Sequence, residues 1–224
     1  MPTHPANHRL WDLLDESERT MLASSGRRIN HPRGTEILHE GAPAGSAFVL
    51  LRGRVKVLAT GSNGCQRILA IRVPGDVIGE LSAIDGCPRS ATVVAIDPVT
   101  VIRIPTESFN TALRNQPAIA HALLKVVIGR LRTANRRRVE YSDTTVAERV
   151  ATTLTELAAE HGRLGESGVA ITLQFSQEDL AGMVAGSREA VVRALRDLRD
   201  ERIISTGRRQ VTILQPHLLG LAAE

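Results

Sequence analysis

The sequence has few cysteines and few aromatic residues, and both shortages exclude classes of protein. Cys65 and Cys87 are its two cysteines among 224 residues. A disulfide framework or an iron–sulfur site needs more cysteines than this. We therefore expect free thiols in a reducing cytosol. Phe, Trp and Tyr together make up 2% of the chain, so the core must be aliphatic.

Long hydrophobic runs are also missing. The first residues, MPTHPANHRLWDLLDESER, carry early charge and no apolar stretch, so we expect no signal peptide. The most apolar run, residues 118–128, is interrupted by His121 and Lys125. It is too short and too polar to span a bilayer. We expect a cytoplasmic protein without a membrane partner.

Sequence motifs of nucleotide enzymes and metal sites are absent. There is no Gly-x-x-x-x-Gly-Lys phosphate loop and no His-Glu-x-x-His, because His39-Glu40 lacks the second histidine. The seven histidines are scattered and the acids do not cluster. We expect no metal and no catalytic residues. The formal net charge of +4 permits a nucleic-acid partner without requiring one.

The first half of the chain reads as a short helix followed by many short strands. Residues 10–23 have the amphipathic pattern of a helix. After Gly26, β-prone segments are separated by Gly, Pro and Asn, which is typical of a sandwich or barrel. We expect strands at residues 29–31, 36–38, 47–51, 54–58, 67–71, 77–78, 91–96 and 99–104.

One stretch between these strands, PGDVIGELSAIDGCPRSA at residues 74–91, suits an anionic ligand. Gly79 lets the backbone approach a ligand closely. Glu80 can accept a hydrogen bond from a sugar hydroxyl, and Arg89 can meet a phosphate with two parallel donors. The alternative is a Glu80–Arg89 ion pair that closes a loop.

Two helices are predicted next, from Thr106, a candidate N-cap, to about Asn115 and from Pro117 to about Tyr141. In the longer helix a seam of heptad spacing favours a symmetric dimer. The alternative is that this helix packs only on its own barrel. Arg130, one turn from the seam, can reach back toward the barrel. The seam consists of Leu124, Leu131 and Arg138, with Val127, Ala134 and Tyr141 beside them.

The last third of the chain predicts a helix-turn-helix. After a hinge at residues 142–145 and a helix at 146–159, Ser176 and Ser187 each cap a short helix, and Gly186 ends the first of the two. Two β-prone pieces bracket residues 162–168. Strands at residues 203–205 and 211–214 then form a wing tipped by Arg208 and Arg209.

The second short helix exposes Arg188, Glu189 and Arg193, near the end from which such helices read bases. Arginine pairs with guanine, and a carboxylate accepts from the cytosine amine. The alternative is a surface Glu189–Arg193 pair of spacing four. From residue 144 onward we count nine arginines against eleven acids, so phosphate contacts must come from local placement of charge.

Four features follow one another along the chain: Gly79-Glu80-Leu81, Arg89-Ser90, a long helix and Ser187-Arg188-Glu189-x-x-x-Arg193. This order closely resembles the catabolite activator (cyclic AMP receptor, CRP/FNR) family of bacterial transcription regulators. The resemblance covers almost the whole chain. It implies that Gly79, Glu80, Leu81, Arg89 and Ser90 line a cyclic nucleotide pocket, with cyclic AMP as allosteric effector. Glu80 would hold the ribose hydroxyl, and Arg89 and Ser90 the cyclic phosphate.

The resemblance also assigns roles to the long helix and the reading helix. Arg130 matches a pocket-side arginine. A Thr-Ser pair that contacts the base in the family is here Ala134-Asn135, of which Asn135 alone can hydrogen-bond an adenine edge. The residues implied to contact DNA are Ser187, Arg188, Glu189 and Arg193, together with the wing residues Arg208 and Arg209.

The expected fold is α+β. Its parts are an N-terminal β jelly-roll cyclic-nucleotide-binding domain (1–116), a long dimerisation helix (117–141) and a C-terminal winged helix-turn-helix domain (142–224). The implied partners are a second copy of the chain, palindromic DNA with half-sites similar to TGTGA, and RNA polymerase. Three alternatives stay open: a regulator with a vestigial or different effector pocket that binds DNA without cyclic AMP, an enzyme acting on nucleotides, and a haem-type gas sensor.

Overall fold

The computed structural model describes residues 8–61, 64, 66–207 and 209–219. The chain separates into two compact units, Met1–Cys65 with Leu69–Arg138, and Gln66–Ile68 with Val139–Glu224. No helix within the described residues is both long and apolar enough to cross a membrane. Cys87 is an exposed free thiol, as expected, and Cys65 lies outside the described residues.

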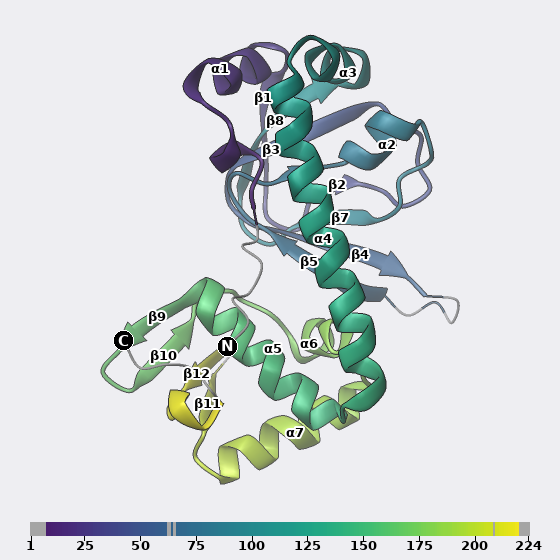
Figure 1. Ribbon diagram of the computed structural model, residues 1–224. Coiled ribbons are helices and arrows are strands. Elements are labelled where there is room, and N and C mark those ends of the chain that lie inside the picture. Colours follow the sequence, from purple (N-terminus) through teal and green to yellow (C-terminus); the bar gives the residue numbers. More distant parts are fainter. Residues whose placement is uncertain (1–7, 62–63, 65, 208, 220–224) are drawn as a thin grey trace. The chain divides into compact units, whose positions relative to one another are not determined.

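Two four-stranded sheets form the framework of the N-terminal unit in the part of the chain that is described (Figure 1). The first has the order β1 (Arg27–His31), β8 (Val99–Pro105), β3 (Ser46–Arg52) and β6 (Val77–Ile78), all antiparallel. The second has the order β2 (Glu36–Leu38), β7 (Thr92–Ala95), β4 (Val55–Thr60) and β5 (Gln66–Arg72). All eight predicted strands are present, which confirms the β-rich N-terminal half.

The first sheet is buried on both faces, which follows from the alternation of side chains along its strands. Val99 and Val101 of β8 lie in a core between the two sheets. Ile102 and Ile104 of the same strand lie in a second core with the helices of this unit. This second core includes Phe109, which is fully buried. Mainly aliphatic residues fill both cores, as the shortage of aromatic residues predicts.

The helices of this unit are α1 (Glu16–Ser24), α2 (Glu80–Asp85), α3 (Thr106–Asn115) and most of α4 (Pro117–Asp143). The predicted first helix is in fact a short 3₁₀ turn η1 (Trp11–Leu13) and then α1, because Asp15 forms a capping box with Glu18 and starts a new helix. The predicted capping role of Thr106 is wrong. The N-cap is Pro105, and no side chain caps this helix.

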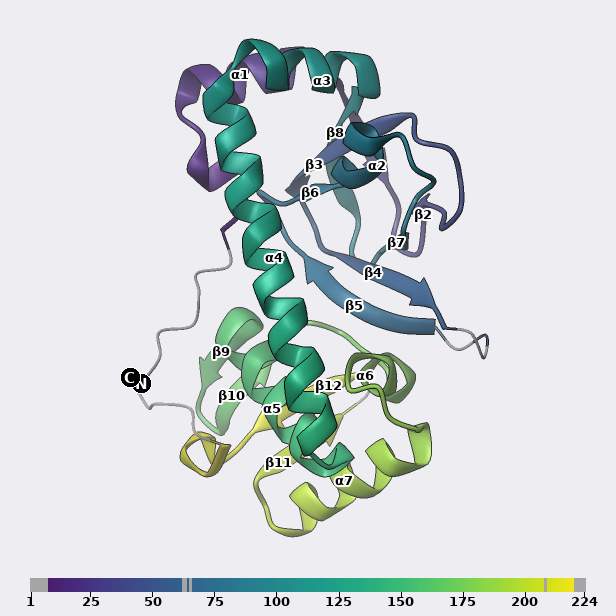
Figure 2. The same cartoon turned by 45° about the vertical axis from the view of Figure 1, so that its right-hand side comes forward.

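Figure 2 shows α4 as a single long helix. On one side of it, Ile119, Ala122, Leu123 and Val126 are buried in the core of the N-terminal unit. On another side lies an exposed stripe, which consists of Leu124 (54% exposed), Ile128 (39%) and Leu131 (59%). Val127, which we expected on the seam, instead packs against the core. The helix therefore packs on its own barrel and also presents an apolar stripe to solvent.

The C-terminal unit is a winged helix-turn-helix. Its helices are α5 (Val146–His161), α6 (Gln177–Met183) and α7 (Arg188–Asp200), followed by the short turn η2 (Pro216–Leu219). Its sheet has the order β11 (Ile204–Gly207), β12 (Gln210–Ile213), β10 (Gly168–Ile171) and β9 (Gly162–Gly165). The predicted wing is thus the hairpin of β11 and β12.

Side-chain caps start α5, α6 and α7, which explains why their beginnings were predictable. Thr145 and Ser176 form capping boxes at α5 and α6, and Ser187 accepts a hydrogen bond from the Ala190 amide at α7. The predicted end of α6 at Gly186 is wrong. The helix ends at Met183, and Ala185 takes the positive φ of 49° in the turn.

Candidate functional site

Gly79 joins strand β6 to helix α2 at a point where the chain is crowded. Its φ is +71°, in the left-handed region that glycine adopts without steric cost. A Cβ at this position would lie 2.7 Å from an Arg89 guanidinium nitrogen and 3.0 Å from Leu38. Glycine is therefore required for Arg89 to reach its observed position. Helix α2 begins directly after it, at Glu80.

Arg89 is 6% exposed and points back under this turn. Its guanidinium donates to the Gly79 carbonyl at 2.7 Å and to the Ser46 carbonyl at 2.6 Å. Burial lowers the pKa of Arg89, and the nearby charge of Glu80 opposes this shift. Within the described residues no carboxylate forms an ion pair with Arg89. The alternative of a Glu80–Arg89 ion pair is therefore not realised.

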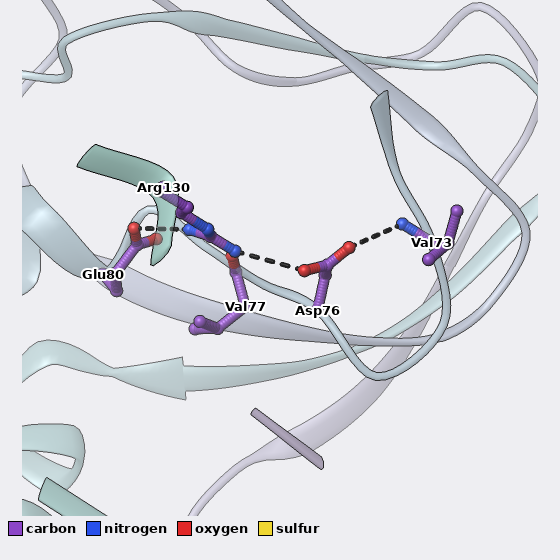
Figure 3. Close-up of polar contacts among 5 residues, drawn as sticks. All are labelled: Val73, Asp76, Val77, Glu80 and Arg130. Carbon is purple, nitrogen blue, oxygen red and sulfur yellow. Dashed lines mark hydrogen bonds and ion pairs between the residues drawn. The ribbon is translucent and has the colours of Figure 1, made fainter. Parts of the chain in front are cut away.

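Glu80 is instead paired with Arg130 of α4, as Figure 3 shows. Arg130 donates to Glu80 Oε1 at 2.8 Å, to Asp76 Oδ1 at 3.2 Å and to the Val77 carbonyl at 2.8 Å. The other oxygen of Asp76 accepts from the Val73 amide at 2.9 Å. Glu80 and Asp76 are 4% and 7% exposed. A single side chain of the long helix thus holds two buried carboxylates of the barrel.

Arg72, the last residue of β5, is a member of this site that our sequence analysis missed. Its pKa is lowered to about 10, mainly by burial and then by the charge of Arg130, while Asp76 and Glu80 act in the opposite direction. The alternation of side chains along β5 could have identified Arg72. Leu69 is half-exposed, so Ala70 and Arg72 lie on the opposite, inward-facing side of the strand. An arginine on the inward-facing side of a strand is the sequence signal.

The remaining predicted pocket residues are more exposed than Glu80 and Arg89. Leu81 is 44% exposed, and Ser90 is exposed beside Arg89. Asn135 is also exposed. Because it follows Arg130 by five helical residues, it lies on a different side of α4. It therefore does not join the group that Arg130 forms with Glu80 and Asp76.

Asn135 instead extends the exposed stripe of α4. Leu124, Ile128 and Leu131 are separated by four and then three residues, and Asn135 follows Leu131 by four. This alternating spacing places residues on one face of a helix. The structure thus brings Gly79, Glu80, Arg89 and Arg130 together within the N-terminal unit, whereas Asn135 lies on the exposed stripe.

Helix α7 exposes the three predicted base-reading residues, Arg188, Glu189 and Arg193. Hydrogen bonds from its own backbone amide and from Ser187 lower the pKa of Glu189, and the charges of Arg188 and Arg193 add to this effect. In the described part of the chain no ion pair joins Glu189 to Arg193. The alternative of a closed surface pair is therefore not realised, and the three exposed side chains lie within the first two turns of α7.

A groove of about 390 Å³ lies between α6, α7 and the wing. Arg188, Arg199, Arg209 and Gln210 contribute to its lining. Arg199, which sequence analysis missed, donates to Thr206 of the wing at 3.2 Å. Arg209 is exposed at the tip of the wing, and Arg208 lies outside the described residues. This face has the arginine-lined form expected of a nucleic-acid interface.

Arg149 of α5 holds the turn of the helix-turn-helix in place, which was also not predicted. It donates to the Val184 carbonyl at 2.8 Å and to the Thr144 carbonyl at 2.6 Å. Its guanidinium lies 5.2 Å from the centre of the Tyr141 ring, and the Tyr141 hydroxyl donates to the Met183 carbonyl at 2.6 Å. The end of α4 is thereby tied to the end of α6.

Comparisons with known families divide the chain in a similar way. Residues 28–116 match the cyclic nucleotide-binding domain, and residues 148–221 match the Crp-like helix-turn-helix domain. Across the described residues, no group of three or more His, Cys, Asp and Glu side chains is arranged to hold a metal ion.

Two related proteins are named as a cAMP-activated transcriptional regulator and as a cyclic AMP receptor protein. The chain is 31% identical to the CRP-like cAMP-activated global transcriptional regulator of Mycobacterium tuberculosis, over 82% of each chain. It is 28% identical to the cyclic AMP receptor protein of Thermus thermophilus, over 92% of each chain. Both matches span most of the chain and therefore include both domains.

Solved structures show the same fold. The c-di-GMP responsive global regulator CLP of Xanthomonas campestris superposes with a TM-score of 0.78 at 21% identity, over 89% of this chain and 99% of the other. FixK2 of Bradyrhizobium japonicum superposes with a TM-score of 0.74 at 27% identity, over 89% and 98%.

Proposed function

Since the chain belongs to the CRP/FNR family of transcription regulators, with a cyclic nucleotide-binding domain and a helix-turn-helix DNA-binding domain, we propose that it is a homodimer switched by cyclic AMP. The proposal includes three parts: a nucleotide-binding domain at residues 1–116, a dimerisation helix at 117–141 and a DNA-binding domain at 142–224. It also includes that the protein is not an enzyme.

In this proposal the cyclic phosphate binds Arg89 and Ser90. Arg89 uses two of its five N–H donors on the carbonyls of Gly79 and Ser46. The remaining N–H donors of Arg89 can bind phosphate oxygens. A bound phosphate would also compensate the buried positive charge of Arg89, which has no carboxylate partner among the described residues. Glu80 would accept from the ribose hydroxyl, and Leu81 would contribute its backbone beside the phosphate.

The observation that carries the proposal is the contact of Arg130 with Glu80 at 2.8 Å. Arg130 belongs to α4, and Glu80 belongs to the motif proposed to bind ribose. A nucleotide that hydrogen-bonds Glu80 therefore changes the surroundings of a buried charge on the long helix. This gives effector binding a direct physical route to α4, as coupling between two sites requires.

The exposed stripe of α4 supports a symmetric dimer. Leu124, Ile128 and Leu131 repeat at the alternating spacing of a coiled-coil seam, and a lone soluble helix rarely exposes such a row. Asn135 continues this spacing. We propose that Asn135 of the partner subunit, rather than the chain's own Asn135, reaches the adenine edge.

Two copies of α7 would then read DNA about 34 Å apart, which is one turn of the duplex. Arg188 and Arg193 would pair with guanines, and Glu189 would accept from a cytosine amine. Ser187, Arg208 and Arg209 would contact the backbone. We propose palindromic sites with half-sites similar to TGTGA, and RNA polymerase as a further partner.

A second candidate is a regulator of the same fold that does not need cyclic AMP. Ala134 favours it, because its side chain cannot hydrogen-bond a base. Glu80 favours it as well, because the protein's own Arg130 already donates to this carboxylate. In this case the dimer would bind DNA in its default state or respond to another effector.

Calorimetric titration with cyclic AMP, with cyclic GMP as the control nucleotide, tests the proposal. We expect a Kd for cyclic AMP in the micromolar range or tighter, and its loss in Arg89→Gln. Arg114→Gln, at an exposed arginine of α3, is the matched control and should bind as the wild type does. Absence of heat with cyclic AMP would refute the proposal in favour of the second candidate.

A further inference from the structure

One face of α7 lines the groove between α6, α7 and the wing. It consists of Arg188, Val192, Leu195 and Arg199, which follow one another by four, three and four residues. This spacing places the four side chains in one row along the helix. The two arginines are eleven residues apart, which is about 16.5 Å along the helix axis. The row therefore has an apolar middle between two positive ends.

Arg199 lies at the end of this row that meets the wing. Its guanidinium donates from Nη1 to Thr206 Oγ1 at 3.2 Å, and an arginine has five N–H donors. Among the residues that the structure describes, no carboxylate forms an ion pair with Arg199. The other donors and the charge of Arg199 are therefore available to a ligand in the groove.

The ionisable lining of the groove is mainly positive. Arg209 of the wing joins the two arginines of α7, and Glu178 of α6 is the single carboxylate in the described part of the lining. The acids at the end of α7, Asp197, Asp200 and Glu201, are not among the described lining residues. The groove therefore attracts an anion, and the carboxylate of Glu178 opposes this attraction.

A strand of DNA backbone has both properties that fit this groove. Its deoxyriboses can contact apolar side chains such as Val192, which is 38% exposed, and its phosphates can accept hydrogen bonds from arginine. A free phosphate would leave the apolar middle of the row uncovered. The shared chemistry of sugar and phosphate therefore favours a nucleic-acid strand over a small anion.

We propose that the groove holds the sugar–phosphate backbone of one DNA strand, where Arg199 binds a phosphate and Glu178 weakens binding by repulsion. This rests on the proposed function, since Arg188, Glu189 and Arg193 would read bases of the same duplex. Phosphate contacts carry no base information. Arg199 therefore contributes affinity without sequence preference, unlike the three base-reading residues.

Fluorescence anisotropy of the full chain with labelled DNA, at several salt concentrations, tests the proposal. One duplex contains TGTGA-like half-sites, and the other has the same bases in scrambled order. Arg199→Gln should weaken binding to both duplexes by the same factor, about tenfold or more at about 0.1 M salt. The slope of log affinity against log salt should become less steep by about 2, because a dimer loses two phosphate contacts. Arg199→Lys should retain most of the affinity and slope.

Three further variants separate charge from structure. Glu178→Gln should tighten binding to both duplexes by about threefold, and by more at low salt. Thr206→Val removes the acceptor of Arg199 but keeps its charge in the groove, so it should leave the salt slope unchanged. Arg163→Gln, at an exposed arginine of β9 outside the groove, is the matched control and should bind DNA as the wild type does.

The outcomes distinguish this inference from the proposed function. An unchanged salt slope in Arg199→Gln would overturn it, as would an equal loss in Thr206→Val, because Arg199 would then only hold the wing. Unchanged or weaker binding by Glu178→Gln would overturn the repulsion. Equal wild-type affinity for both duplexes would refute the proposed base reading, while a reduced slope in Arg199→Gln would still support the groove. Wild-type binding of neither duplex, with or without cyclic AMP, would refute both.

Discussion

Replacing Arg130 with methionine should destabilise the N-terminal unit strongly. The substitution keeps the apolar stem but removes the guanidinium from Glu80 and Asp76, whose side chains are 6% and 10% exposed. Removing one partner of a buried ion pair costs about 3–5 kcal/mol. Because Arg72 lies within electrostatic reach of both carboxylates, we expect the lower end, about 3 kcal/mol.

Urea unfolding followed by fluorescence measures this loss. Trp11 is the one tryptophan of the chain, and it packs against the core of the N-terminal unit, so its emission reports on that unit. With a slope of about 2 kcal/mol per molar urea, the midpoint should fall by about 1.5 M. The exposed control Arg114→Met should change the free energy of unfolding by less than about 0.5 kcal/mol.

A double-mutant cycle with Glu80→Gln isolates the pair itself. We expect a coupling energy above about 1 kcal/mol, because the two groups are in direct contact. A surface ion pair would instead give a loss in the free energy of unfolding below about 1 kcal/mol in Arg130→Met, with no coupling to Glu80. That result would refute our argument that Arg130 ties α4 to the barrel.

Three further predictions concern the C-terminal unit. Arg193→Gln should cost about 1–3 kcal/mol of specific DNA binding and relax base preference at one position, and unchanged discrimination in competition gel shifts would speak against its reading role. Tyr141→Phe should lower the free energy of unfolding by about 0.5–1.5 kcal/mol through loss of the bond to Met183; denaturant melts that match the wild type would contradict this. Hydrogen bonds from Thr145 lower the pKa of Glu148, so its contribution to stability is present above pH 4.5 and is lost as the pH falls through the lowered value. In thermal melts at several pH values, the stability of Glu148→Gln should therefore fall less at acid pH than that of the wild type. The same pH dependence of stability in both proteins would contradict this prediction.

The elements that sequence patterns predicted best are those with local signals. Thr145, Ser176 and Ser187 cap helices through bonds to residues three positions away, and such spacing can be read directly. Thr106 shows the limit of this method, because a capping residue type stands inside the first turn of α3 without capping it.

In the long helix α4, the heptad spacing of apolar residues was assigned in part to the wrong positions. We paired Leu124 with Val127, but the exposed stripe passes through Ile128. Val127 follows Val126, which is buried in the core, and the run of adjacent apolar residues does not tell which of them turns outward. Only the packing of α4 on the barrel decides this.

The candidate site was predictable where its residues are close in sequence. Gly79, Glu80 and Arg89 occupy one short stretch, and their types already suggested an anion site. Arg72 and Arg149 were missed because their roles depend on groups from other elements. An isolated arginine in a strand or helix gives no sequence signal of the charges and carbonyls that surround it in the fold.

The measurement that tests the central claim most directly is DNA affinity with and without cyclic AMP. Fluorescence anisotropy with a labelled palindrome of TGTGA-like half-sites would be compared for the wild type and Arg89→Gln. We predict that saturating cyclic AMP raises the DNA affinity of the wild type by about 5–150-fold, and that Arg89→Gln removes this effect. Equal wild-type affinity with and without the nucleotide would contradict the account.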